Sequence, residues 1–133
     1  MAQDFGNLVV RTYTAGGGLP VAGALVRISG AEEINRFVAH TLLTDLDGST
    51  RSVSLPAPKR ANSLTPNSSG ESFALYNVEV EKEGYYTRRI YGLAIFPRVT
   101  TLLPVNMIPV SDTGESEFPR GSIDTVIPDN SNL

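Results

Sequence analysis

The 133-residue sequence contains no cysteine and no tryptophan, and its single histidine is His40. Without cysteine there is no disulfide and no thiolate, so the stability of the fold must come from packing. Structural and catalytic zinc sites draw mainly on Cys and His side chains. The sequence therefore predicts no metal site and no cofactor.

Long hydrophobic runs are also missing, since no apolar stretch approaches the roughly 20 residues that a membrane-spanning helix needs. The N-terminal residues 1–6 show neither the basic start nor the apolar stretch of a secretory leader. We therefore expect no membrane span. The compartment stays open between the cytoplasm, including that of a spore or forespore, and export with a leader that has been removed.

The net charge of -3 is unevenly distributed along the chain. Residues 1–110 carry ten Lys or Arg and nine Asp or Glu, a balance of +1. Residues 111–133 carry one Arg and five Asp or Glu, a balance of -4. A nucleic-acid-binding protein usually presents a broad basic face, and no such face is expected here.

What the sequence does contain is a series of segments in which apolar and polar residues alternate. The clearest is 73–82, where Tyr76, Val78 and Val80 alternate with polar side chains. Turn signals separate the segments at the spacing of a β-sandwich. We therefore predict an all-β protein, a seven-stranded antiparallel Greek-key β-sandwich. The predicted strands are 7–14, 24–29, 36–44, 51–55, 73–82, 86–91 and 99–110.

The regions between and after these strands carry their own signals. Gly48 suits a left-handed turn position, and Pro104 predicts an edge strand or a bulge. We predict one domain at 1–110 and an extended acidic tail at 111–133. Within the tail, residues 120–127 are a candidate edge strand because they include several apolar side chains.

Three short motifs occur in a characteristic order. They are Pro20-Val21-Ala22-Gly23-Ala24-Leu25-Val26, then Thr44-Asp45-Leu46-Asp47-Gly48, then Glu83-Gly84-Tyr85. In this order they resemble the carboxypeptidase regulatory-like domain, a transthyretin-like or prealbumin-like β-sandwich, over about residues 6–110. The resemblance implies an accessory domain and not a carboxypeptidase, and the His-Glu-x-x-His zinc motif is absent.

Further segments resemble the module that accompanies peptidoglycan-binding and spore-cortex-lytic proteins of clostridial-type bacteria. They are Leu55-Pro56-Ala57-Pro58, Leu64-Thr65-Pro66, Tyr76-Asn77-Val78, Glu83-Gly84-Tyr85-Tyr86 and Pro104-Val105-Asn106-Met107-Ile108-Pro109. The resemblance implies peptidoglycan, or a protein associated with the cell wall, as the partner. No wall-binding or lytic domain is present in this sequence, so we leave open whether the chain is free-standing or part of a longer protein.

Aromatic and cationic residues are concentrated just after the third motif. Aromatic rings beside guanidinium groups can stack on sugars and receive the carboxylates of wall polymers. The alternative is that these tyrosines are corner or packing residues, which are common in sandwiches. The candidate binding residues are Tyr85, Tyr86, Arg88, Arg89 and Tyr91, and, in the irregular stretch 56–72, Lys59 and Arg60.

Catalytic machinery is not apparent in the sequence. His40 lies in the middle of a predicted strand, and no Gly-x-Ser-x-Gly nucleophile elbow is present. We therefore expect that the chain is not an enzyme and has no catalytic residues. The predicted function is a non-catalytic accessory or binding module at a bacterial cell wall or spore cortex. The alternative is a structural or assembly subunit, a homo-oligomer that associates through its sheet edges and tail.

Overall fold

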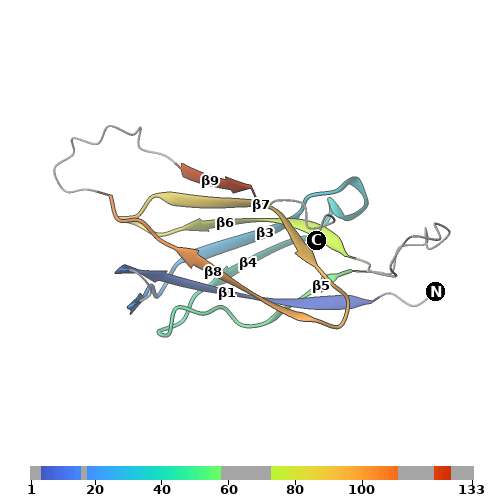
Figure 1. The fold of residues 1–133 in the computed structure, drawn as a ribbon, viewed down its shortest axis with the longest axis horizontal. Coiled ribbons are helices and arrows are strands. Elements are labelled where there is room, and N and C mark those ends of the chain that lie inside the picture. Colours follow the sequence, from blue (N-terminus) through green and yellow to red (C-terminus); the bar gives the residue numbers. More distant parts are fainter. Residues whose placement is uncertain (1–3, 16–17, 58–72, 111–121, 127–133) are drawn as a thin grey trace.

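A computed structural model describes residues 4–15, 18–57, 73–110 and 122–126, the last of these by their backbone. These residues form nine strands and the short 3-10 helix η2 (Glu33–Asn35), arranged as two sheets packed face to face (Figure 1). The all-β sandwich predicted from the sequence is therefore present. The strands are β1 (Phe5–Thr14), β2 (Leu19–Pro20), β3 (Leu25–Gly30), β4 (Ala39–Leu43), β5 (Val53–Pro56), β6 (Ala74–Glu81), β7 (Thr87–Ile95), β8 (Thr100–Asn106) and β9 (Ser122–Val126).

The two sheets differ in size and order. In sheet A, β1 is the central strand, with β8 along one side and β2 and β5 along the other. Sheet B has the strand order β4-β3-β6-β7-β9. Among the described residues, β8 pairs with β1 alone, so Pro104 lies on an edge strand, where a missing N–H is tolerated.

The predicted seven-stranded antiparallel arrangement needs two corrections. The described residues contain nine strands, and two of the pairings, β1 with β8 and β7 with β9, are parallel. Alternation tells which side chains face inward, but it is the same for either strand direction. β2 is also only two residues long, too short to show any alternation.

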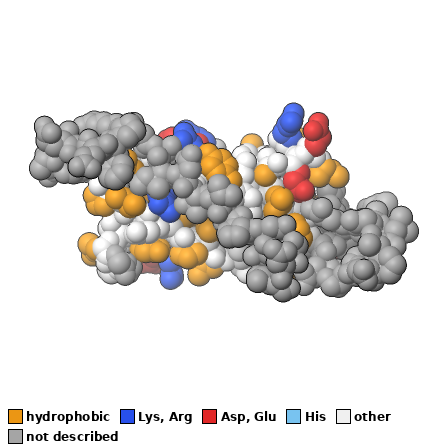
Figure 2. Space-filling view, turned by 45° about the horizontal axis from the view of Figure 1, so that its top comes forward, with side chains coloured by type: hydrophobic (Ala, Val, Ile, Leu, Met, Phe, Trp, Pro, Cys, Tyr) orange, Lys and Arg blue, Asp and Glu red, His pale blue; other side chains and the backbone are white. Residues whose placement is uncertain are grey.

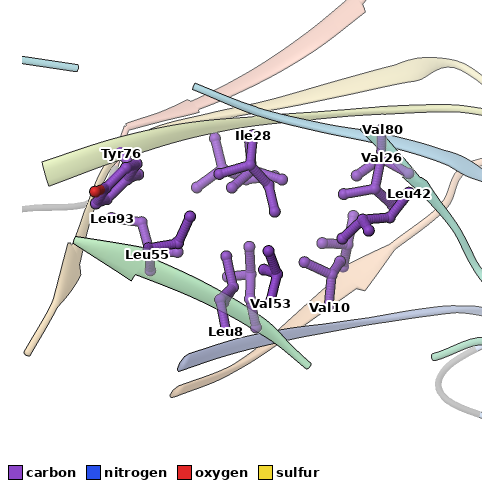
Figure 3. Close-up of a cluster of buried hydrophobic side chains, with 14 of the residues drawn as sticks. Leu8, Val10, Val26, Ile28, Leu42, Val53, Leu55, Tyr76, Val80 and Leu93 are labelled. Atoms are coloured by element: carbon purple, nitrogen blue, oxygen red, sulfur yellow. The ribbon is translucent and has the colours of Figure 1, made fainter. Parts of the chain in front are cut away.

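The core lies between the sheets and follows the alternation of the strands. Leu8 and Val10 of β1 are fully buried, as are Val26 of β3 and Tyr76 and Val80 of β6. Figure 3 shows the side chains of β1 and β5 pointing toward those of β3 and β6. Among the described residues, each sheet therefore has one face in the core and one face turned outward.

A register irregularity in sheet B affects the candidate residues of β7. The pairing shifts between Tyr76 and Val78, so that Asn77 opposes an extra residue of β7. The Asn77 side-chain oxygen accepts a hydrogen bond from the Gly92 N–H at 3.1 Å. The bulge lies beyond the pair Val78 and Ile90, so Arg89 keeps its register with Glu79.

Candidate binding site

A shallow groove runs over the outer face of sheet B, crossing β4, β3, β6 and β7. Its volume is about 320 Å³. Residues at alternate positions of adjacent strands face the same side, so outward side chains of four strands meet in it. The residues that line the groove include Arg27, Thr41, Asn77, Glu79, Arg89 and Tyr91.

Charged side chains in the groove form ion pairs with one another and with Glu81 beside it. Arg27 Nη1 lies 3.5 Å from Glu79 Oε1 and 3.0 Å from Glu81 Oε2. Arg89 Nε lies 3.2 Å from the other oxygen of Glu79. Glu79 therefore receives one guanidinium from each neighbouring strand. The four charges sum to zero, and their pairing holds both guanidinium groups over the sheet.

Opposite charges also lie close together elsewhere on the surface. Figure 2 shows Lys or Arg side chains next to Asp or Glu side chains, and its coloured residues form no broad patch of one sign. On the face that Figure 2 shows, charges of both signs are interspersed with apolar and neutral side chains.

The structure divides the predicted β7 cluster between the two faces of sheet B. Arg89 pairs in register with Glu79 on the outer face, and Tyr91 also lines the groove. Arg88 is instead opposite Val80, which is fully buried. Tyr86 is two residues before Arg88 and is 8% exposed. Arg89 and Tyr91 therefore share one surface, whereas Tyr86 and Arg88 belong to the inward side.

Tyr85 has a different environment again. It is partly buried and packs against the core, and its backbone forms a β-bridge with Pro109. Its N–H donates to the Lys82 carbonyl at 3.0 Å, which closes the corner that leads into β7. Lys59 and Arg60, the second predicted group, lie outside the described residues.

Sequence reasoning missed the groove residues that come from β3 and β4. Arg27 and Thr41 are register partners, and Arg27 is also the partner of Glu79. Alternation alone places Arg27 outward, but nothing local indicates that it meets a residue more than fifty positions away. His40 also lines the groove, and its register partner is the buried Ile28.

Within the described part of the chain, no three His, Cys, Asp or Glu side chains gather in a way that could hold a metal ion. No helix among the described residues is both long and apolar enough to cross a membrane.

Comparisons with known proteins identify the fold. No protein-family model matches the chain, and no curated protein matches its sequence. Among solved structures, 3-chlorocatechol 1,2-dioxygenase from Rhodococcus opacus 1CP is similar with a TM-score of 0.56 at 14% identity, over 82% of this chain and 61% of that one. Wild-type catechol 1,2-dioxygenase from Acinetobacter radioresistens is similar with a TM-score of 0.53 at 14% identity, over 91% of this chain and 58% of that one.

A further similar structure is not a dioxygenase. GBS52, the minor pilin of Streptococcus agalactiae, has a TM-score of 0.53 at 15% identity, over 90% of this chain and 49% of the pilin. The chain thus spans about 60% of the dioxygenases and about half of the pilin. At such low identity the likeness shows a shared sandwich fold alone, and the dioxygenase activity and the pilin role belong to those proteins.

These neighbours correct one expectation from the sequence. The inference that the chain is not an enzyme is contradicted, because the solved structures similar to it include catechol 1,2-dioxygenases. The likeness points weakly toward a fold that enzymes use. The error was to infer an absence of activity from missing hydrolase and zinc motifs, which represent only some catalytic chemistries.

Proposed function

We propose that this chain is a binding module that holds a bacterial wall polymer, peptidoglycan of the cell wall or spore cortex, in the groove over β3, β6 and β7. The observation that carries the proposal is that Tyr91 lines the same groove as Arg27 and Arg89. A tyrosine ring can stack on a sugar, and a guanidinium fork can receive a carboxylate in bidentate geometry. Peptidoglycan presents both sugar faces and peptide carboxylates.

The same proposal extends to the finer architecture and the family. We infer a transthyretin-like Greek-key arrangement of the longer strands, as in the carboxypeptidase regulatory-like domain, with residues 111–133 as an acidic tail. Support comes from the order of the three sequence motifs and from a similar structure, the minor pilin of a Gram-positive bacterium. In the related bacterial module, this domain accompanies a wall-binding or lytic partner.

Co-sedimentation with purified peptidoglycan tests the groove. We expect the wild-type protein to be retained, and Arg89→Ala or Tyr91→Ala to weaken binding about fivefold, as expected for the loss of roughly 1 kcal/mol. Matched controls are Arg36→Ala, which removes an exposed arginine beside η2, and Tyr13→Ala, which removes a tyrosine from sheet A. No retention of the wild type, or equal losses in the controls, would contradict the proposal.

The two candidate residues that lie outside the described part of the chain enter the same assay as separate variants. Lys59→Ala and Arg60→Ala test the stretch 56–72. A loss of binding in these variants, with Arg89→Ala unchanged, would move the site away from the groove.

Self-association is a second proposal, and it is supported by a different observation. Residues Ser122–Val126 add to the edge of sheet B as β9, so a segment from the acidic C-terminal region has affinity for a sheet edge. Exposed sheet edges are templates for pairing with another chain. Light scattering at protein concentrations up to the millimolar range tests this proposal, and a mass that stays at one chain throughout would contradict it.

A further inference from the structure

β9 is the terminal strand of sheet B and is held there by its pairing with β7. Its five residues run parallel to β7, from Ser122 opposite Thr87 to Val126 opposite Tyr91 (Figure 1). A strand at the end of a sheet is fixed by one ladder, whereas an inner strand has two. β9 is therefore bound in the way that an added peptide strand is bound to a sheet edge.

The connection that leads to β9 is much longer than the gap that it spans. Val110 donates its N–H to the Gly84 carbonyl at 2.9 Å, so the described chain ends beside Gly84, just before β7. It is described again at Ser122 beside Thr87, the first residue of β7, and Thr87 is three residues after Gly84, at most about 11 Å away. The eleven intervening residues, 111–121, can span up to about 36–40 Å when extended. A chain of this length also reaches the β7 edge of another copy.

Charge favours the pairing of this segment with β7 in either copy. Residues 111–133 carry a balance of -4, from one Arg against five acidic residues. The paired part of β7 contains Arg88 and Arg89, and the register partner of Arg89 is Asp124. The single acidic residue of β9 thus lies in register with an arginine of β7, which favours this register over a shifted one.

We propose that the β7 edge and Ser122–Val126 form an exchangeable pair, in which this segment of one copy adds to β7 of a second copy in the same parallel register. The inference rests on the self-association proposal and names the surface and partner that self-association uses. Its tests measure mass and cross-linking and involve no peptidoglycan, so failure of peptidoglycan binding would leave it standing.

The protein can place β9 on its own β7 or on the β7 of another copy, and the balance between these two forms depends on the connection and on protein concentration. The ladder is the same whether β9 comes from its own chain or from another. A short flexible linker gives an effective concentration in the millimolar range. At micromolar concentration the protein is therefore mainly monomeric, and exchange becomes substantial when the connection prevents β9 from folding back.

Shortening the connection tests this directly. The segment 108–110 runs antiparallel to residues 84–86, just before β7, whereas β9 runs parallel to β7, so the chain must reverse direction between them. Deletion of residues 111–119 leaves two residues for that reversal and prevents β9 from reaching its register in its own chain. We expect the mass from light scattering to change from one chain to two or more.

A control removes the ladder from the shortened protein. Asp124→Pro and Thr125→Pro together eliminate at least one N–H that faces β7, because alternate residues of a strand face the same neighbour. We expect this variant to return to one chain. A shortened protein that is folded by circular dichroism yet monomeric would overturn the proposal.

A cross-linking experiment uses the full-length chain and decides the matter if the shortened protein fails to fold. Because the sequence has no cysteine, introduced thiols are unique. Thr87 and Ser122 are register partners, and neighbouring strands are about 4.8 Å apart, within disulfide range. Copies carrying Thr87→Cys are mixed with copies carrying Ser122→Cys and oxidised at increasing concentration.

The expected product is a disulfide-linked heterodimer that increases with protein concentration. The control mixture pairs Thr87→Cys with Ser54→Cys, an exposed position on β5 of sheet A. Heterodimer no more abundant than in this control would overturn the exchange. If light scattering still shows oligomers in that case, self-association stands and uses another edge, such as β4 or β8.

Discussion

Thr44 joins two of the motifs that are apart in the sequence. Its hydroxyl donates to the Val21 carbonyl at 2.8 Å and accepts from the Ala24 N–H at 2.8 Å, and its backbone carbonyl accepts from Gly23 N–H at 2.9 Å. Thr44 is buried, so its hydroxyl depends on these partners for its hydrogen bonds, and the Val21 carbonyl also accepts from the Thr12 hydroxyl at 2.7 Å. The hydroxyl therefore connects the turn before β3 to the segment that follows β4.

Thr44→Val tests this connection, because valine has nearly the same shape and no hydroxyl. We expect the free energy of unfolding to fall by about 2–3 kcal/mol, since a buried N–H and a buried C=O lose a partner. Urea unfolding measures the change. Thr44→Ser is the control, because it keeps the hydroxyl. If both variants lose the same stability, the hydroxyl is not responsible.

Ionisation of the Tyr76 hydroxyl makes the free energy of unfolding depend on pH. Burial raises the pKa of its hydroxyl; a hydrogen bond with Asn35 lowers it, and the charge of Glu32 raises it. The hydroxyl also donates to the Pro56 carbonyl at 2.6 Å. Because the folded pKa exceeds the unfolded value of about 10, the unfolded chain ionises first as pH rises. The contribution of Tyr76 is complete below about pH 10 and is lost as pH rises through the folded pKa.

Chemical denaturation at neutral pH and above pH 10 measures this effect. Tyr76→Phe loses the hydrogen bond, so we expect it to be less stable than wild type near pH 7. Above about pH 10 the difference between the two proteins should shrink, because phenylalanine does not titrate. A constant difference across this range would show that Tyr76 does not titrate differently in the folded state.

At the scale of elements, the turns decide how consecutive strands meet. In the turn after β4, the Asp45 carboxylate accepts from the backbone N–H groups of Asp47 and Ser49 at 2.9 and 3.0 Å. Gly48 completes this turn with φ of +82°, as its position after two aspartates in the sequence predicts. The same turn packs beside β1, where the Gly48 carbonyl accepts from the Thr12 N–H at 2.7 Å.

Two glycine substitutions separate backbone strain from crowding. Gly48 and Gly84 both have positive φ, so alanine at either costs about 1 kcal/mol in strain. At Gly48 the new methyl group would also collide with the Thr12 carbonyl oxygen, whereas at Gly84 nothing lies within 4 Å. We expect Gly48→Ala to be the more destabilising by more than about 1 kcal/mol in urea unfolding. Equal losses would mean that the turn moves away from β1 without penalty.

At the scale of the whole molecule, the core residues that the structure describes belong to the part of the chain before β9. The buried hydrophobic residues that the structure describes lie between Leu8 and Met107. Strand β9 adds to the edge of sheet B and does not close the sandwich. We therefore predict that residues 1–110 fold alone with a cooperative thermal transition, at a lower melting temperature than the full chain because β9 is missing. Loss of near-ultraviolet circular dichroism in residues 1–110 would contradict this prediction.

The candidate site was only partly predictable from the sequence. Alternation correctly places Arg27 outward on β3, and composition drew attention to Arg89 and Tyr91. Their proximity to one another required the pairing of β3, β6 and β7, which joins segments distant in the chain. The same pairing separates Arg88 from Arg89, although the two are adjacent in sequence. The candidate residues that are neighbours in the sequence therefore lie on two opposite faces of sheet B.

The sequence by itself determined which side chains enter the core and where the chain turns. Both properties are local, because alternation has a period of two residues and a glycine at positive φ needs only its own backbone. The tertiary structure decided the parallel pairing of β1 with β8, the attachment of β9 to β7, and the meeting of Arg27, Glu79 and Arg89. These depend on contacts between distant segments, which are set by how the whole chain packs.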